Sequence, residues 1–222
     1  MSGEARIPVE RHDRTFRILH WLIVTEMAVL LVTGLAVSET LDIIPLLSRG
    51  LARAIHLVVG FAWLGTITFF LYYFIYSGEY RWFGLRRIGE AIDTLVEEIR
   101  AFLRGEHLPE PIRYDPRTGE YVEKIYPTEV LAWWMWALIW TVMATTGLGL
   151  VFPETFGFFN RFWHAIVGDA TRAPVASRTV HLVFAVVMVA VVLVHGYLVI
   201  VTGIWKGIVY GKREEPVVEY EV

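Results

Sequence analysis

Four long runs of apolar residues dominate the chain, and polar segments separate them. The runs cover about residues 16–37, 52–76, 130–152 and 179–205. Each run reaches the roughly 20 residues that an α-helix needs to cross the ~30 Å hydrocarbon layer of a membrane. The segments between them carry most of the prolines, which favour helix boundaries. The pattern predicts an all-α membrane protein, a four-transmembrane-helix bundle in which residues 1–222 form one domain.

The segment between the second and third runs contains a helix of a different kind. From Arg81 to Arg104, apolar residues recur at steps of three and four, and the remaining positions are mostly charged. The apolar positions are Trp82, Leu85, Ile88, Ile92, Leu95, Ile99 and Phe102. This periodicity predicts an amphipathic helix lying on the membrane surface or on the bundle. Residues 105–129 are expected to form an ordered but irregular cap.

Basic residues are distributed unevenly between the two ends of the predicted bundle. Most of the 20 lysines and arginines lie in the two terminal flanks and in the middle segment. With four spans these three segments share one side, and the positive-inside rule places that side in the cytoplasm. We therefore expect a multi-pass protein of the cell inner (cytoplasmic) membrane, surrounded by membrane lipids, with both termini cytoplasmic. The polar N-terminal flank lacks the features of a signal peptide, so the first run is expected to be a retained span.

Composition excludes several kinds of site. The chain has no cysteine, so it can hold no thiolate-bound iron–sulfur cluster, no cysteine-ligated zinc and no disulfide. Any iron–sulfur relay must belong to another subunit. The net charge of −3 and the lack of a basic arm argue against a nucleic-acid partner.

Four histidines lie within the apolar runs: His20, His56, His181 and His195. The fourteen residues from His181 to His195 bring a helix back to within about 40° of the same face and ~21 Å further along its axis. Alternating span directions match His20 with His195 near the inner side, and His56 with His181 near the outer side. Two imidazoles saturate a haem iron, and ionisable groups within spans are usually functional. The set predicts two bis-histidine haems b, whereas each histidine alone is equally compatible with packing.

Other residues near the histidines suit the same cofactor. Gly34 lies fourteen residues after His20, and a glycine there would let a flat macrocycle approach the helix. Arg17 at the inner mouth, and Arg53 and Arg178 at the outer mouth, could pair with haem propionates. The alternatives are close helix packing for the glycine and interfacial anchoring for the arginines. Glu26, inside the first run, could serve a proton path or a local hydrogen bond.

Polar segments contain three more histidines and one apolar patch. His12 and His107 are expected to be solvated. His164 lies on an apolar stretch on the outer side that could form an interfacial helix and could face a partner subunit. The same segment, residues 153–178, is rich in aromatic side chains, and exposed patches of this kind mark interaction sites. These side chains are Phe156, Phe158, Phe159, Phe162 and Trp163. The alternative is a loop that dips into the lipid headgroups.

Several segments resemble the γ (cytochrome b) subunit of membrane-bound respiratory formate dehydrogenase. They are RILHW and VTGL in the first run, ARAIHLVVG in the second, ATTGLGLVFPETF in the third, and HLVFAVVMVAVVLVHGYLVIVTGIWKGIVYGK in the fourth. The resemblance covers about residues 11–213. The wider family also includes the cytochrome b subunits of membrane nickel–iron hydrogenases and of thiosulfate-type molybdenum reductases.

The resemblance implies an electron path and a quinone site. A periplasmic catalytic subunit and its iron–sulfur partner would deliver electrons to the outer haem b. From the inner haem b they would reach a quinone, menaquinone or another, bound near the inner ligand, which matches His195. The family's quinone segment before the third span is altered here: Tyr126 fits, but Pro127 replaces an asparagine, and Thr128 and Glu129 stand as substitutes.

Together these features predict a diheme b-type membrane-anchor subunit of an oxidoreductase complex, similar to the formate dehydrogenase γ subunit. It would have no catalytic residues of its own apart from a quinone-reactive site. The first alternative is the same fold serving a hydrogenase or a sulfur-compound reductase. An alternative of another class is a haem-free four-helix transporter or assembly protein.

Overall fold

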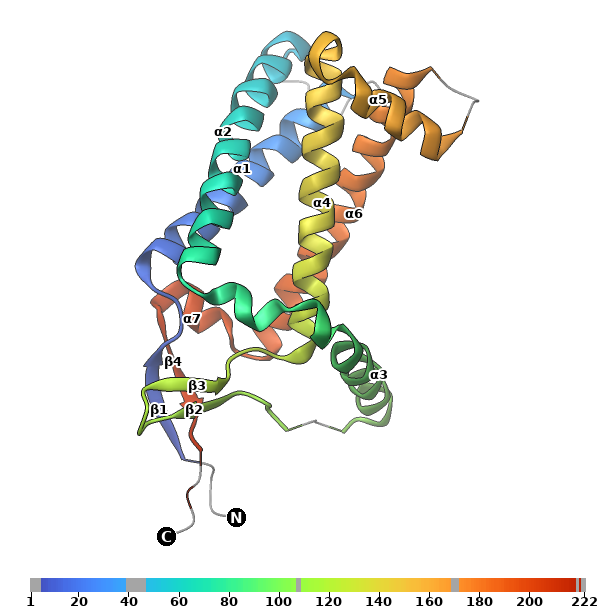
Figure 1. Ribbon diagram of the computed structural model, residues 1–222. Helices are drawn as coiled ribbons and strands as arrows, with labels where there is room; N and C mark the ends of the chain where they lie inside the picture. The colour runs from blue at the N-terminus through green and yellow to red at the C-terminus, as the bar shows by residue number, and fades with distance from the viewer. Residues whose placement is uncertain (1–4, 39–46, 107–108, 169–171, 219, 221–222) are drawn as a thin grey trace. The chain divides into compact units, whose positions relative to one another are not determined.

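The computed structural model describes residues 5–38, 47–106, 109–168, 172–218 and 220. Four helices in it are long and apolar enough to cross a membrane: α1 (Arg14–Val37), α2 (Arg49–Tyr76), α4 (Pro127–Val151) and α6 (Ala173–Val201) (Figure 1). The predicted all-α membrane architecture is confirmed. Large apolar side chains remain exposed along these helices, as a lipid environment allows; Val58, Val186 and Leu193 are 70%, 65% and 68% exposed.

The described chain falls into two compact units. The first comprises Met1–Trp82, Ile112–Lys124 and Ile204–Val222, and the second comprises Phe83–Pro111 and Ile125–Gly203. The long helices of the first unit are α1 and α2, and those of the second are α4 and α6. The expectation of one domain over residues 1–222 stays a prediction.

Local capping fixes where the spans begin. The Asp13 side chain accepts a hydrogen bond from Phe16 N at 2.9 Å ahead of α1, and the Ser48 hydroxyl accepts one from Leu51 N at 3.3 Å ahead of α2. Side chains of this kind satisfy amides that have no partner in the first helical turn. The fourth span differs most from expectation, because it starts at Ala173 and ends at Val201 instead of Trp205. It ends there because Gly203 adopts a φ of +70°, and a short helix, α7 (Trp205–Tyr210), follows.

The segment between α2 and α4 is partly as expected. Two 3₁₀ turns, η1 (Glu79–Phe83) and η2 (Leu85–Arg87), precede the amphipathic helix α3 (Ile88–Arg104). The helix is therefore shorter than the predicted range of Arg81 to Arg104. Its apolar face includes exposed Ile92, Ile99 and Phe102.

The cap expected over residues 105–129 is less irregular than predicted, because its middle part forms two strands. β2 (Arg113–Asp115) and β3 (Glu120–Glu123) form an antiparallel hairpin (Figure 1). The Asp115 carboxylate accepts a hydrogen bond from Arg117 N at 2.8 Å, and Gly119 supplies a φ of +73°, so the intervening DPRTG sequence makes the turn.

A second strand pair joins the two flanks of the chain within the first unit. β1 (Arg6–Glu10) pairs antiparallel with β4 (Lys212–Pro216), with Arg6 opposite Pro216 and Glu10 opposite Lys212 (Figure 1). The flank before α1 and the flank after α7 therefore lie on the same side, as an even number of spans requires. The sequence pattern did not predict this pair.

The predicted loop over residues 153–178 contains a helix, α5 (Pro153–Val167), which is kinked at Phe156. The buried Asn160 side chain donates to Gly149 O at 2.7 Å and ties α5 to the end of α4. Phe158, Phe162 and Ile166 recur every four residues and are 49%, 55% and 60% exposed. The aromatic segment therefore presents an exposed apolar stripe on a helix, in agreement with the helix expected around His164.

Candidate functional site

In the first unit, α1 and α2 bring His56 against a threonine and a glycine. Thr33 Oγ1 lies 3.0 Å from His56 Nδ1. A Cβ added to Gly34 would stand 3.2 Å from His56 Cε1, closer than most side-chain contacts allow. Gly34 therefore serves a close approach to the imidazole, and residues 33, 34 and 56 share one depth along the helix pair.

In the second unit, α4 and α6 repeat this arrangement around His181. Thr146 Oγ1 lies 2.7 Å from His181 Nδ1. A Cβ on Gly147 would stand 3.8 Å from His181 Cε1. The same tripeptide, Thr-Gly-Leu, thus lies beside a histidine in each unit.

The other two histidines lie toward the opposite ends of their helix pairs. His20 precedes Thr33 by 13 residues on α1, which corresponds to ~20 Å of helix. His195 follows His181 by 14 residues on α6, which corresponds to ~21 Å. Their rings lie edge-on to tryptophans, with centroids 5.4 Å apart for His20 and Trp21 and 6.3 Å apart for His195 and Trp136. Each pair of long helices therefore carries two of these four histidines, at two depths.

Three of the histidines follow an arginine by three residues. Arg17 precedes His20, Arg53 precedes His56 and Arg178 precedes His181, and residues three apart are neighbours on a helix surface. The side chains of Arg53 and Arg178 are exposed. Arg17 is partly buried; its Nη1 donates to Val209 O at 3.2 Å.

A family model described as prokaryotic cytochrome b561 matches residues 11–209. The chain belongs to the prokaryotic cytochrome b561 family. It is thus a multi-pass membrane protein, a haem b electron-transfer subunit of the kind that anchors redox partners. No curated protein matches the chain.

The residues of this cytochrome fit the haem b that its family implies. Neutral imidazole is a strong ligand for haem iron. The side-chain-free face of Gly34 lies beside His56, and cationic side chains that suit carboxylates lie one helical turn from three of the histidines. No cluster of three or more His, Cys, Asp or Glu side chains that could hold a bare metal ion occurs in the part of the cytochrome that the structure describes.

The intramembrane acid of the cytochrome has a local partner. Glu26 is buried, and its Oε1 accepts a hydrogen bond from the Thr66 hydroxyl at 2.9 Å. The expected local hydrogen bond is confirmed, and the proton path stays a prediction.

The residues predicted to contact quinone lie at the start of α4. Tyr126 is the residue before the helix, and Glu129 Oε1 accepts a hydrogen bond from Tyr126 N at 2.9 Å, which caps α4. The Thr128 hydroxyl lies 3.4 Å from Glu98 Oε1 on α3. Burial raises the pKa of Glu98, although the hydrogen bond from Thr128 opposes this shift. Sequence reasoning missed Glu98, because it sits among the charged positions of an amphipathic helix.

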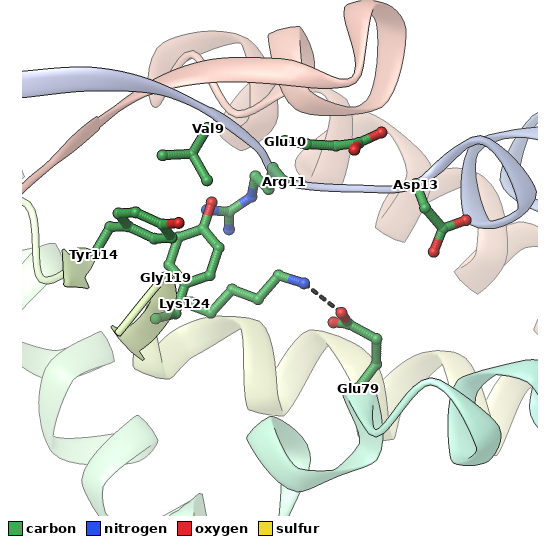
Figure 2. A pocket seen from close by; sticks show the side chains of 9 residues that line it. Val9, Glu10, Arg11, Asp13, Glu79, Tyr114, Gly119 and Lys124 are labelled. Carbon is green, nitrogen blue, oxygen red and sulfur yellow. Dashed lines mark hydrogen bonds and ion pairs between the residues drawn. The ribbon is translucent and has the colours of Figure 1, made fainter. Parts of the chain in front are cut away.

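The first unit also contains a polar pocket of about 370 Å³ (Figure 2). Its charged lining residues are Glu10, Arg11, Asp13, Glu79 and Lys124, and none of the predicted site residues lines it. Figure 2 shows Lys124 pointing toward Glu79, with which it forms an ion pair. Burial lowers the pKa of Lys124, and Glu79 opposes this shift. With three carboxylates and two cations, the lining favours no single class of charged ligand.

The structure describes two of the three histidines that lie outside the apolar runs. His12 is partly buried and stacks on Phe16 with ring centroids 4.5 Å apart, so the prediction of a solvated ring is wrong. His164 lies partly buried in α5. His107 lies outside the described residues.

Proposed function

We propose that this cytochrome is a diheme subunit in which four histidines are the axial ligands. His56 and His181 form the outer pair, and His20 and His195 form the inner pair. The observation that carries the proposal is a repeated contact: within each helix pair a Thr-Gly-Leu segment lies beside a histidine. In each unit the second histidine is ~20 Å further along. Bis-histidine haem b supplies a one-electron carrier without an open coordination position.

The surrounding side chains would orient and anchor the cofactor. Gly34 would keep the helix surface flat beside His56. Arg53 and Arg178 would pair with outer propionates, and Arg17 with an inner one, through charge-assisted hydrogen bonds. Arg17 already donates to Val209 O, so one of its remaining N–H groups would have to serve the propionate.

The redox partner is proposed to dock on the outer side, where α5 lies between the outer ends of α4 and α6. A chain without cysteine needs a separate iron–sulfur subunit, and the exposed stripe of Phe158, Phe162 and Ile166 suits an apolar contact. The positive-inside rule gives the orientation, with both termini in the cytoplasm. We propose a formate dehydrogenase catalytic subunit as the partner on the periplasmic face, because of the sequence resemblance. A nickel–iron hydrogenase or a thiosulfate reductase is the alternative, and the family match is equally compatible with it.

The quinone is proposed to bind on the inner side, near His195. Quinone reduction takes up protons, and a carboxyl or tyrosine within hydrogen-bond reach can supply them. Tyr126 and Glu129 at the start of α4 are our proposed contacts. Glu98, whose pKa burial raises, is proposed as an additional proton-carrying group.

Histidine variants test the ligand assignment. We expect two non-covalent haems per wild-type chain in a pyridine haemochrome assay. His56→Ala and His181→Ala should lose the same haem, and His20→Ala and His195→Ala the other, distinguished by their reduced spectra and midpoint potentials. His164→Ala is the matched control and should keep both.

The outcomes separate the rival functions. Loss of the same haem in His20→Ala and His181→Ala would refute the pairing by depth. A purified chain without haem absorption would favour the transporter or assembly alternative. The co-purifying catalytic subunit identifies which oxidoreductase the cytochrome serves.

A further inference from the structure

The same hydrogen-bonded triplet of groups occurs twice in the molecule, once in each unit. A helix carbonyl, a threonine hydroxyl and a histidine Nδ1 follow one another in both. Thr33 Oγ1 lies 2.7 Å from Val29 O and 3.0 Å from His56 Nδ1. Thr146 Oγ1 lies 2.6 Å from Val142 O and 2.7 Å from His181 Nδ1. Both threonines are almost completely buried, with 3% and 0% of their surface exposed.

Counting protons assigns the direction of each hydrogen bond. A threonine hydroxyl has one proton and two lone pairs, and a backbone carbonyl can only accept. The hydroxyl proton of Thr33 therefore points to Val29 O, and that of Thr146 to Val142 O. Each oxygen can then interact with its histidine only as an acceptor, so each Nδ1 carries a proton. In a neutral imidazole this leaves the lone pair on Nε2.

We propose that Thr33 and Thr146 are positioning residues for the outer haem. Each would hold its histidine in the Nδ1–H tautomer, with Nε2 as the iron ligand, and fix the rotation of the ring. The inference rests on the proposed ligation by His56 and His181 and adds to it a determinant of the haem potential. A hydrogen bond from the remote N–H makes an imidazole a stronger donor to the metal. The carbonyl behind each hydroxyl polarises it and makes its oxygen a better acceptor.

A more basic ligand stabilises ferric iron more than ferrous iron, so both threonines lower the potential of the outer haem. The valine variants, Thr33→Val and Thr146→Val, keep the shape of the side chain and remove the hydroxyl that accepts from Nδ1. If the ligand's affinity for ferric haem falls tenfold relative to its affinity for ferrous haem, the one-electron reduction potential rises by about 59 mV. Loss of such a remote partner typically weakens metal binding by about 10- to 100-fold.

The experiment is a redox titration of the full chain, with haem content and low-temperature EPR of the ferric haems measured on the same samples. The potential of the outer haem should rise in each valine variant and rise further in the double variant, whereas that of the inner haem stays constant. Thr33→Ser and Thr146→Ser keep the hydroxyl and should restore the wild-type potential. Thr25→Val and Thr141→Val are matched controls, because these exposed threonines donate to carbonyls of the same two helices at 2.8 Å.

Two results would overturn the inference. One is a double valine variant with both potentials unchanged, and the other is an equal shift of both haems. If the valine variants do not retain the outer haem, the serine variants decide, because loss of haem from them as well would show that the threonines act through packing alone. Failure of the ligation itself is distinguishable, since His56→Ala and His181→Ala would then keep two haems.

Discussion

Replacing Glu215 by glutamine should loosen the strand pair that joins the two flanks of the chain. Glu215 is 0% exposed, and its carboxylate receives Arg11 Nη1 at 3.2 Å and Arg213 Nη1 at 2.6 Å. The Tyr121 hydroxyl donates to the same carboxylate at 3.2 Å. Glu215 therefore links the residue after β1 with β3 and β4.

The magnitude follows from the geometry. With an effective dielectric constant of about 20, the separations of 2.6 and 3.2 Å correspond to attractions of about 6 and 5 kcal/mol. Desolvation of the three ions offsets most of this gain, but removing one partner leaves the others buried without a counter-charge, which costs about 3–5 kcal/mol. Glutamine keeps the shape of the side chain and one acceptor oxygen, so the variant loses mainly the electrostatic attraction. We expect this loss to lower the free energy that is needed to separate β1 from β4.

Amide hydrogen exchange in detergent micelles measures this local opening directly. Peptides from β1 and β4 should exchange roughly 10²–10⁴-fold faster in Glu215→Gln, since each 1.36 kcal/mol corresponds to about tenfold. Glu214→Gln makes the same charge change at the exposed neighbouring position and should alter stability by about 0.5 kcal/mol at most. The difference should persist in 1 M salt, because buried pairs are screened little. Equal exchange in the two variants, or an effect that vanishes in high salt, would refute the reasoning.

Two further outcomes test other parts of the molecule. Gly34→Ala places a Cβ 3.2 Å from His56 Cε1, so it should perturb the spectrum of the outer haem and lower its content. Gly60→Ala is the control and should do neither, because its Cβ would stand 3.9 Å from Leu30. Equal haem content and spectra in the two variants would contradict a role for Gly34. Burial holds the pKa of His12 well below its ordinary value of 6.5, with a smaller contribution from nearby Arg11, Lys124, His20 and Arg17. The unfolded chain therefore binds more protons below that pH, so thermal unfolding should show stability falling by up to about 1.4 kcal/mol per pH unit as the pH drops below about 6.5. His12→Phe should flatten this slope, and an unchanged slope would assign the effect to other groups.

The four spans could be predicted because their signal is local and long. Three of them lie within three residues of their predicted ends, and the fourth is displaced by six residues at its start and four at its end. The strands β1 and β4 could not, since KREEP has no apolar alternation and Arg213 and Glu215 are buried only through the distant Arg11 and Tyr121. Arg17 shows the same limit. Its position at the mouth of the first span was evident, but its hydrogen bond to Val209 O depends on how α7 returns to α1.

The equivalence of the two helix pairs was hidden by unequal spacing. Thr33 precedes His56 by 23 residues, whereas Thr146 precedes His181 by 35, so no fixed repeat period relates the two Thr-Gly-Leu segments. The difference arises in the connections, because the second one contains the 15 residues of α5 and the first does not contain a corresponding helix within its described part. Both hairpins thus meet the same local requirement, a hydroxyl and a bare backbone beside a histidine that follows an arginine. Within the described residues, only the hairpin of the second unit carries an added amphipathic helix, at the end where a redox partner is proposed to dock. The ligand environment and the docking surface would then be separate parts of the hairpin, and the sequence of α5 could change with the partner while both histidine sites stay the same.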